Sequence, residues 1–118
     1  MPKLDMDGPF DLTNAVIDKE VGAAVIGNFA LGHLNKNGKF VVKVVGRSDN
    51  DLNRELKSAR RRFSAGLFAK MLGRGGIDKF KFSIADTALS AYQVEQRAFD
   101  SFGGLRKLLD RRTPAPPG

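Results

Sequence analysis

The sequence contains no cysteine and no tryptophan, and it has one histidine, His33, and one tyrosine, Tyr92, beside nine phenylalanines. Without cysteine there is no disulfide, no thiolate nucleophile and no cysteine-rich zinc site, and a single histidine excludes a multi-histidine metal centre. No apolar run approaches the ~18 residues that a membrane-spanning helix needs, and the acidic N-terminal residues, interrupted by Gly8 and Pro9, do not resemble a signal peptide. We therefore expect one cytoplasmic domain with no membrane partner.

Basic residues outnumber acidic ones and are concentrated in the second half of the chain. The 118 residues carry 20 Lys and Arg against 13 Asp and Glu, a net charge of +7. Residues 1–53 have a balance of −1 and residues 54–118 a balance of +8. Such a surface favours a polyanion, because each phosphate that a cation neutralises releases counterions. We predict binding to nucleic acid, with DNA preferred, through Arg47, Lys57, Arg60, Arg61, Arg62, Lys79 and Lys81. The alternative is that these charges serve only solubility.

Local signals predict helices and strands in the order α-β-β-α-α-β-α. Thr13 is typical of a helix cap, and the β-prone runs 27–34 and 39–45 are joined by Asn37-Gly38, a strong hairpin signal. Residues 79–84 (Lys-Phe-Lys-Phe-Ser-Ile) alternate polar with apolar side chains, as in a strand with one solvated face. Helices are expected at 52–63, at 67–72, and from Asp86 or Thr87 to the glycines at 103–104.

This order predicts an α+β fold, with a small three-stranded antiparallel sheet flanked by helices. We expect a flexible N-terminal segment over residues 1–10, a single domain over residues 11–112 and a proline-rich tail over residues 113–118.

One carboxylate stands on the apolar stripe of the last predicted helix. The stripe consists of Ala88, Ala91, Tyr92, Ala98, Phe99 and Phe102, and Glu95 occupies a position on the same helical face. A carboxylate buried there costs several kcal/mol unless it is paired or binds a cation. Two interpretations remain open: a salt bridge to one of the arginines, or a functional carboxylate such as a Mg²⁺ ligand.

Taken in order, four features resemble the GIY-YIG nuclease domain: Gly27-Asn28-Phe29, Val44-Val45-Gly46, Arg54 eight residues after Gly46, and Glu95 on the last helix. The likeness extends over residues 8–118 and is greatest to a small bacterial subgroup. It implies a three-stranded antiparallel sheet with flanking helices, and metal-dependent cleavage of a phosphodiester in DNA. It also implies that Glu95 holds a divalent metal (Mg²⁺ or Mn²⁺), that Arg54 clamps a phosphate, and that two tyrosines position or deprotonate water.

The chain departs from the family at the proton-transfer positions. Phe29 and Val44 stand where the two signature tyrosines belong, and neither side chain carries a hydroxyl. Ser58 and Thr113 replace histidines of the family, and Asp110 replaces an asparagine. Loss of general base catalysis typically costs ~10²–10⁴ in rate.

Two other residues are candidates to supply a catalytic polar group. His33 shares a strand face with Phe29, and Tyr92 lies one helical turn before Glu95. The simpler interpretation is a histidine at the edge of the core and a core aromatic residue. We predict a nuclease-like domain that binds nucleic acid, with weak or no metal-dependent cleavage. The alternatives are an active Mg²⁺-dependent endonuclease with a rearranged general base, or a degenerate domain that binds a protein partner.

Overall fold

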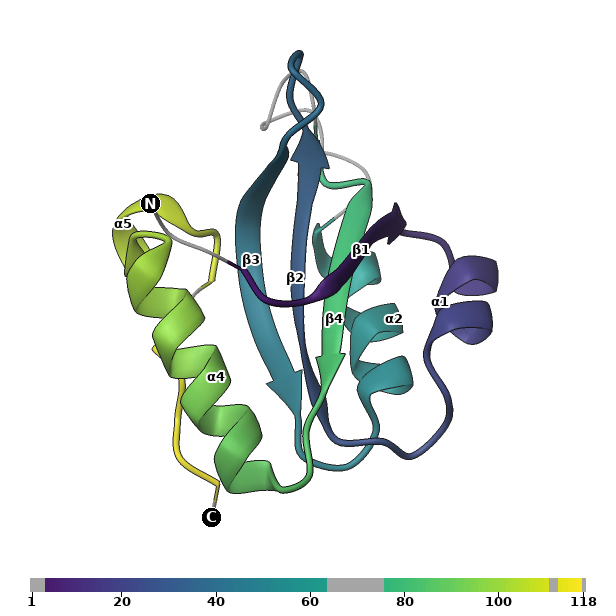
Figure 1. Ribbon diagram of the computed structural model, residues 1–118, viewed down its shortest axis with the longest axis vertical. Coiled ribbons are helices and arrows are strands. Elements are labelled where there is room, and N and C mark those ends of the chain that lie inside the picture. The colour runs from purple at the N-terminus through teal and green to yellow at the C-terminus, as the bar shows by residue number, and fades with distance from the viewer. Residues whose placement is uncertain (1–3, 64–75, 111–112, 118) are drawn as a thin grey trace.

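The computed structural model describes residues 4–63, 76–110 and 113–117, in which one sheet lies between two layers of helices (Figure 1). In chain order the elements are β1 (Asp7–Asp11), α1 (Asn14–Glu20), β2 (Gly27–Leu34), β3 (Phe40–Ser48), α2 (Leu52–Phe63), β4 (Lys79–Ile84), α4 (Ala88–Ser101) and α5 (Gly104–Lys107). The predicted α+β class is confirmed. The helix predicted at 67–72 lies outside the described residues.

The sheet has four strands instead of the three that we predicted. Its order is β1-β4-β2-β3, and all three pairings are antiparallel. The additional strand, β1, includes residues 7–10 of the segment that we expected to be flexible. Gly8 and Pro9 interrupt the strand pattern in the sequence, so local signals do not indicate β1. Its register with β4 is irregular between Asp7 and Phe10. Tertiary packing holds it in place, because the ring centroid of Phe10 lies 5.5 Å from that of Phe80 and 5.9 Å from that of Phe82.

Most of the other local predictions agree with the structure. β2 and β4 have the predicted bounds, whereas β3 begins one residue after the predicted start, at Phe40, and ends three residues beyond the predicted end, at Ser48. The short helix α5 was not predicted. The Thr13 hydroxyl accepts the N–H of Val16 at 3.2 Å and so caps α1. Thr87, rather than Asp86, caps α4 by accepting the N–H of Ser90 at 3.1 Å. Side-chain caps of this kind satisfy N–H groups that have no partner within the helix.

Each face of the sheet packs against its own helices (Figure 1). α1 and α2 cover one face, where the core includes Ile17, Phe29, Leu31, Leu56, Phe80 and Phe82. α4 covers β2 and β3 on the other face, where the core includes Ala30, Val45, Ala98 and Phe99. Lys79 and Lys81 alternate with Phe80 and Phe82, so they lie on the less covered face of β4, as predicted. Within the ranges given above, no helix combines the length and apolar character needed to cross a membrane.

Candidate functional site

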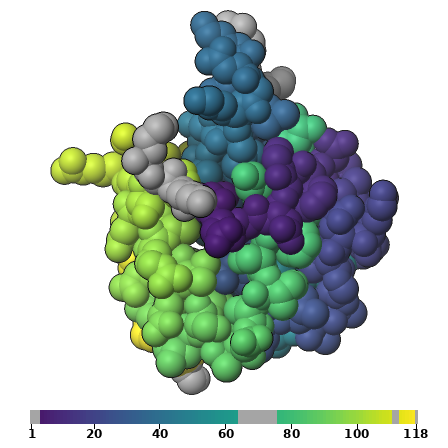
Figure 2. Space-filling model, viewed as in Figure 1, coloured from purple at the N-terminus to yellow at the C-terminus, as the bar shows by residue number. Residues whose placement is uncertain are grey.

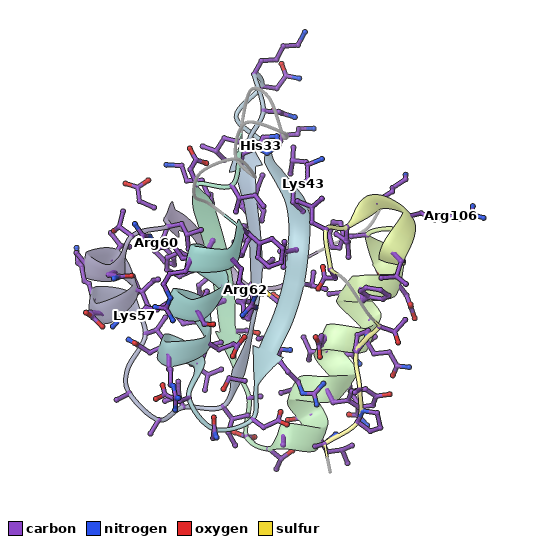
Figure 3. The ribbon with its side chains drawn as sticks, turned by 180° about the vertical axis from the view of Figure 1, so that it is seen from behind. His33, Lys43, Lys57, Arg60, Arg62 and Arg106 are labelled. Atoms are coloured by element: carbon purple, nitrogen blue, oxygen red, sulfur yellow. The ribbon has the colours of Figure 1, made fainter. Side chains whose placement is uncertain are left out.

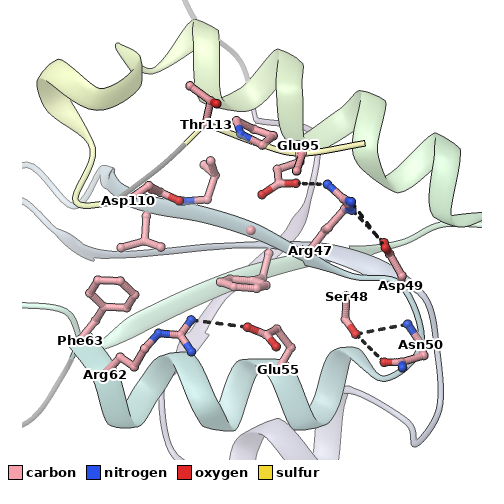
Figure 4. A pocket seen from close by; sticks show the side chains of 16 residues that line it. Arg47, Ser48, Asp49, Asn50, Glu55, Arg62, Phe63, Glu95, Asp110 and Thr113 are labelled. Carbon is pink, nitrogen blue, oxygen red and sulfur yellow. Dashed lines mark hydrogen bonds and ion pairs between the residues drawn. The ribbon is translucent and has the colours of Figure 1, made fainter. Parts of the chain in front are cut away.

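A pocket of about 800 Å³ lies along the outer edge of β3, between α2 and α4 (Figure 4). It forms there because β3 is the last strand of the sheet, so that its outer side faces the space between the two helical layers. β2 and β3 contribute Phe29 and residues 44–48, α2 contributes three side chains on one side, and α4 and the chain beyond α5 contribute to the other side. The charged residues that line it are Arg47, Asp49, Glu55, Arg62, Glu95 and Asp110.

Most of the positions singled out by the family resemblance meet in this pocket. Phe29, Val44, Glu95, Asp110 and Thr113 all line it, although they come from β2, β3, α4 and the segment that follows α5. The fold therefore brings together five positions that the sequence spreads over much of its length. Phe29 and Val44, which stand where the resemblance implies tyrosines, are both buried and apolar.

The floor of the pocket is a contact between the ring of Phe29 and the backbone of Gly46. The two residues face each other across the β2–β3 pair, and Phe29 is only 2% exposed. A Cβ atom on Gly46 would lie 2.3 Å from Cζ of that ring. Only glycine leaves room for the ring in this arrangement, so Gly46 has a packing role here.

Glu95 is held in an ion pair with Arg47 (Figure 4). Arg47 Nη1 donates to Glu95 Oε1 at 2.6 Å, and Arg47 Nε donates to Asp49 Oδ1 at 2.8 Å. The side chains of Arg47 and Glu95 are 12% and 13% exposed. The guanidinium also lies over the ring of Tyr92, 5.2 Å from its centroid. Of the two interpretations of Glu95, the salt bridge to an arginine is confirmed.

The surroundings of the Glu95 carboxyl act on its pKa in opposite directions. Burial raises the pKa above its ordinary value, while the hydrogen bond and the positive charge of Arg47 lower it; the carboxylates of Asp49 and Glu55 raise it again. The net direction is upward, because removal from water outweighs the single cationic partner.

Asp110 stands beside Glu95 on the same side of the pocket. Burial raises the pKa of Asp110 to about 6, and the charge of Glu95 acts in the same direction. The N–H of Val45 opposes this by donating to Oδ1 of Asp110 at 3.2 Å. Next to it, the N–H of Leu109 donates to the carbonyl of Lys43 at 2.7 Å. The segment after α5 is therefore attached to the outer edge of β3 by two hydrogen bonds.

The structure separates Arg54 from Glu95, although the resemblance assigns both to one reaction centre. Arg54 is exposed and lines a smaller pocket of about 280 Å³, together with Ser58 and Arg61. The two pockets share Ser48, Asn50 and Glu55 as a common rim. Arg54 points away from the main pocket because of the rotation of α2 about its axis. Glu55 and Arg62, seven residues apart, face the main pocket, so Arg54 and Arg61 face about 100° away.

Neither His33 nor Tyr92, the two other candidates to supply a catalytic polar group, lines the main pocket. His33 lies at the base of the β2–β3 hairpin (Figure 3), four residues or about 13 Å along the strand from Phe29, and it does not line the pocket. Its Nδ1 is buried without a hydrogen-bond partner in the part of the chain that the structure describes. Tyr92 packs beneath Arg47 and is also absent from the lining.

The basic residues of α2 that we predicted to bind nucleic acid point in several directions (Figure 3). Lys57 donates to Asp18 at 2.5 Å, and Nε of Arg60 donates to the carbonyl of Leu12 at 3.2 Å, both on the side next to α1. Arg62 points toward the main pocket and pairs with Glu55 at 3.4 Å. Arg61 is exposed beside Arg54.

The predicted contacts on β4 lie on the other face of the sheet. Lys79 pairs with Asp11, and Nζ of Lys81 lies 5.4 Å from the ring centroid of Phe40. Arg47, counted among the same contacts, is bound to two carboxylates in the pocket. The seven predicted residues therefore do not form one continuous basic surface.

Two exposed lysines outside the predicted set of nucleic-acid contacts occupy the tip of the β2–β3 hairpin, which projects beyond the rest of the molecule (Figure 2). Lys36 and Lys39 are both exposed there. The Oδ1 of Asn35 accepts the N–H groups of Asn37 and Lys39, which shapes the turn. The sequence contains a signal for this basic tip, because no acidic residue occurs between Glu20 and Asp49.

The donor set of the pocket does not fit a resident metal ion. Glu95, the ligand that the resemblance implies, already accepts a charged hydrogen bond from Arg47. No group of three or more His, Cys, Asp or Glu side chains that could hold a metal occurs among residues 4–63, 76–110 and 113–117.

Comparison of the chain with protein-family models, with curated proteins and with solved structures finds no match.

Proposed function

We propose that this chain is a nuclease-like domain that binds nucleic acid and has weak or no metal-dependent phosphodiesterase activity. The observation that carries the proposal is the content of the main pocket. It collects five positions that the GIY-YIG resemblance makes functional, but it presents Phe29 and Val44 in place of hydroxyl groups. Its glutamate is neutralised by Arg47. Without a group to position and deprotonate water, hydrolysis loses ~10²–10⁴ in rate.

Binding to nucleic acid is supported by cations that are not engaged in ion pairs. Arg54 and Arg61 lie on one face of α2, and no ion pair joins either of them to a described residue. Their spacing of seven residues corresponds to about 10 Å along a helix, or about three nucleotide steps of a duplex strand. Ser48, Asn50 and Ser58 line the same small pocket as further hydrogen-bonding groups, together with the carboxylates of Asp51 and Glu55. A guanidinium binds phosphate in a planar, two-point geometry, so this face suits a phosphate backbone.

Binding of a labelled DNA duplex, measured over a range of salt concentrations, tests this part of the proposal. The double variant R54A/R61A removes both free arginines from α2. K19A/K107A is the matched control, because it removes the same charge from two exposed lysines on α1 and α5. We expect R54A/R61A to weaken binding and to reduce the slope of log K against log salt by about 1.8, at about 0.9 per phosphate contact. Binding that ignores salt, or an equal loss in the control, would contradict the proposal.

A second candidate function is an active endonuclease with a rearranged general base. The position of Asp110 favours it, because this carboxyl lines the main pocket beside Glu95. Nicking of supercoiled plasmid in Mg²⁺ and in Mn²⁺ distinguishes the two candidates, with E95Q and D110N as variants. We expect wild type and both variants to give the same background nicking. Nicking by wild type that both substitutions abolish would favour the active enzyme.

A further inference from the structure

We propose that Arg47 occupies, at Glu95, the place that a divalent cation would take, and so prevents a metal ion from binding in the pocket. The choice of Glu95 rests on the proposed nuclease-like function, but the claim itself concerns only which cation this carboxylate accepts.

The contacts of Arg47 fix its guanidinium against the carboxylate. Nη1 lies 2.6 Å from Glu95 Oε1, and Nε and Nη2 donate to the two oxygens of Asp49 at 2.8 Å and 3.4 Å. Tyr92 supports the guanidinium from one side. Three elements thus hold the group in position: the end of β3, the loop after it, and α4. The two bonds to Asp49 therefore help to keep the guanidinium beside Glu95.

The charge of Arg47 is permanent, since a guanidinium stays protonated at every pH at which proteins are stable. It therefore satisfies a buried carboxylate under the same conditions in which Mg²⁺ would otherwise be attracted. An ion bound to Oε1 would also lie within a few ångströms of this guanidinium and would be repelled by it.

Without Arg47, the balance of charge in the pocket would favour a cation. The lining then retains the carboxyl groups of Asp49, Glu55, Glu95 and Asp110, against Arg62 as the cation among the described lining residues. Carboxylate oxygens with open coordination positions for water are the ligands that Mg²⁺ and Mn²⁺ prefer.

Titration with Mn²⁺ alone, followed by the loss of the free-ion paramagnetic resonance signal, tests the proposal without any nucleic acid. R47M removes the charge while retaining an unbranched apolar stem. R97M is the matched control, because Arg97 is exposed on α4, outside the pocket. We expect R47M to bind Mn²⁺ with a Kd on the order of 1 mM. Wild type and R97M should bind at least tenfold more weakly, and R47M/E95Q should lose the gained site.

Two results would overturn the proposal. One is Mn²⁺ binding by wild type that E95Q abolishes. The other is a folded R47M variant, verified by circular dichroism, that gains no Mn²⁺ binding. If R47M does not fold, the comparison of wild type with E95Q still decides the first result, and R47K, which retains a cation, is expected to bind no more Mn²⁺ than wild type. A failure of DNA binding leaves this titration unaffected, so the two proposals can fail separately.

Discussion

Replacing Gly46 by alanine is expected to destabilise the protein through one contact, with the ring of Phe29. The added Cβ would lie 2.3 Å from Cζ, 2.7 Å from Cε2 and 3.0 Å from Cε1 of this ring. The ring cannot swing into solvent at low cost, because it is 2% exposed and belongs to the core beneath α2. Overpacking of this kind costs about 1–3 kcal/mol, a considerable part of a total stability of roughly 5–15 kcal/mol.

Urea unfolding measures this loss directly. With a denaturant slope of about 2 kcal/mol per M, a loss of about 2 kcal/mol lowers the midpoint by roughly 1 M. Gly22→Ala is the matched control, because no atom lies within 4 Å of a Cβ at that position and its φ is not in the left-handed region. Its effect should stay within about 0.5 kcal/mol.

A double-mutant cycle shows whether the Phe29 ring is the cause. Phe29→Ala alone should cost about 3–5 kcal/mol, because it empties a buried site. In the F29A background, Gly46→Ala should cost less than it does alone, by a coupling energy of about 0.5–3 kcal/mol. Additive effects, or a G46A midpoint equal to that of wild type, would refute the argument from the ring contact.

Two further predictions concern the charged residues of the pocket. Arg47→Met leaves Glu95 without its partner and should lower the free energy of unfolding by about 3 kcal/mol, and R47M/E95Q should recover part of that loss. Urea unfolding of wild type, R47M, E95Q and R47M/E95Q checks this, and fully additive effects of the two substitutions would contradict it. The folded-state pKa of Asp110 is about 6, above the ordinary 3.8, so the native state binds the extra proton and stability should fall as pH rises from about 4 to 7. Asp110→Asn should remove about 1–2 kcal/mol of that fall, less than the whole pKa shift would give, because the carboxyl is partly solvated. Urea unfolding of variant and wild type at several pH values measures this, and equal dependence of stability on pH in the two proteins would refute it.

Local signals in the sequence were sufficient for most of the secondary structure. Thr13 and Thr87 cap their helices because a hydroxyl accepts an N–H only three residues away, and β4 follows from an alternation over six residues. β1 could not be predicted in this way. Its pattern is interrupted by Gly8 and Pro9, and the contacts of Phe10 that hold it come from a strand some 70 residues later in the chain.

The candidate site shows the same division. The sequence by itself identified Glu95 as a carboxylate on a buried helical face that needed a cation, because a period of 3.6 residues fixes which side chains share a face. Only the tertiary structure decided that the cation is Arg47, since β3 and α4 meet through the packing of the sheet and not through any local pattern. The packing of α2 likewise directs Arg62 into the main pocket and Arg54 out of it, because the rotation of a helix about its axis is set by the surface that it covers.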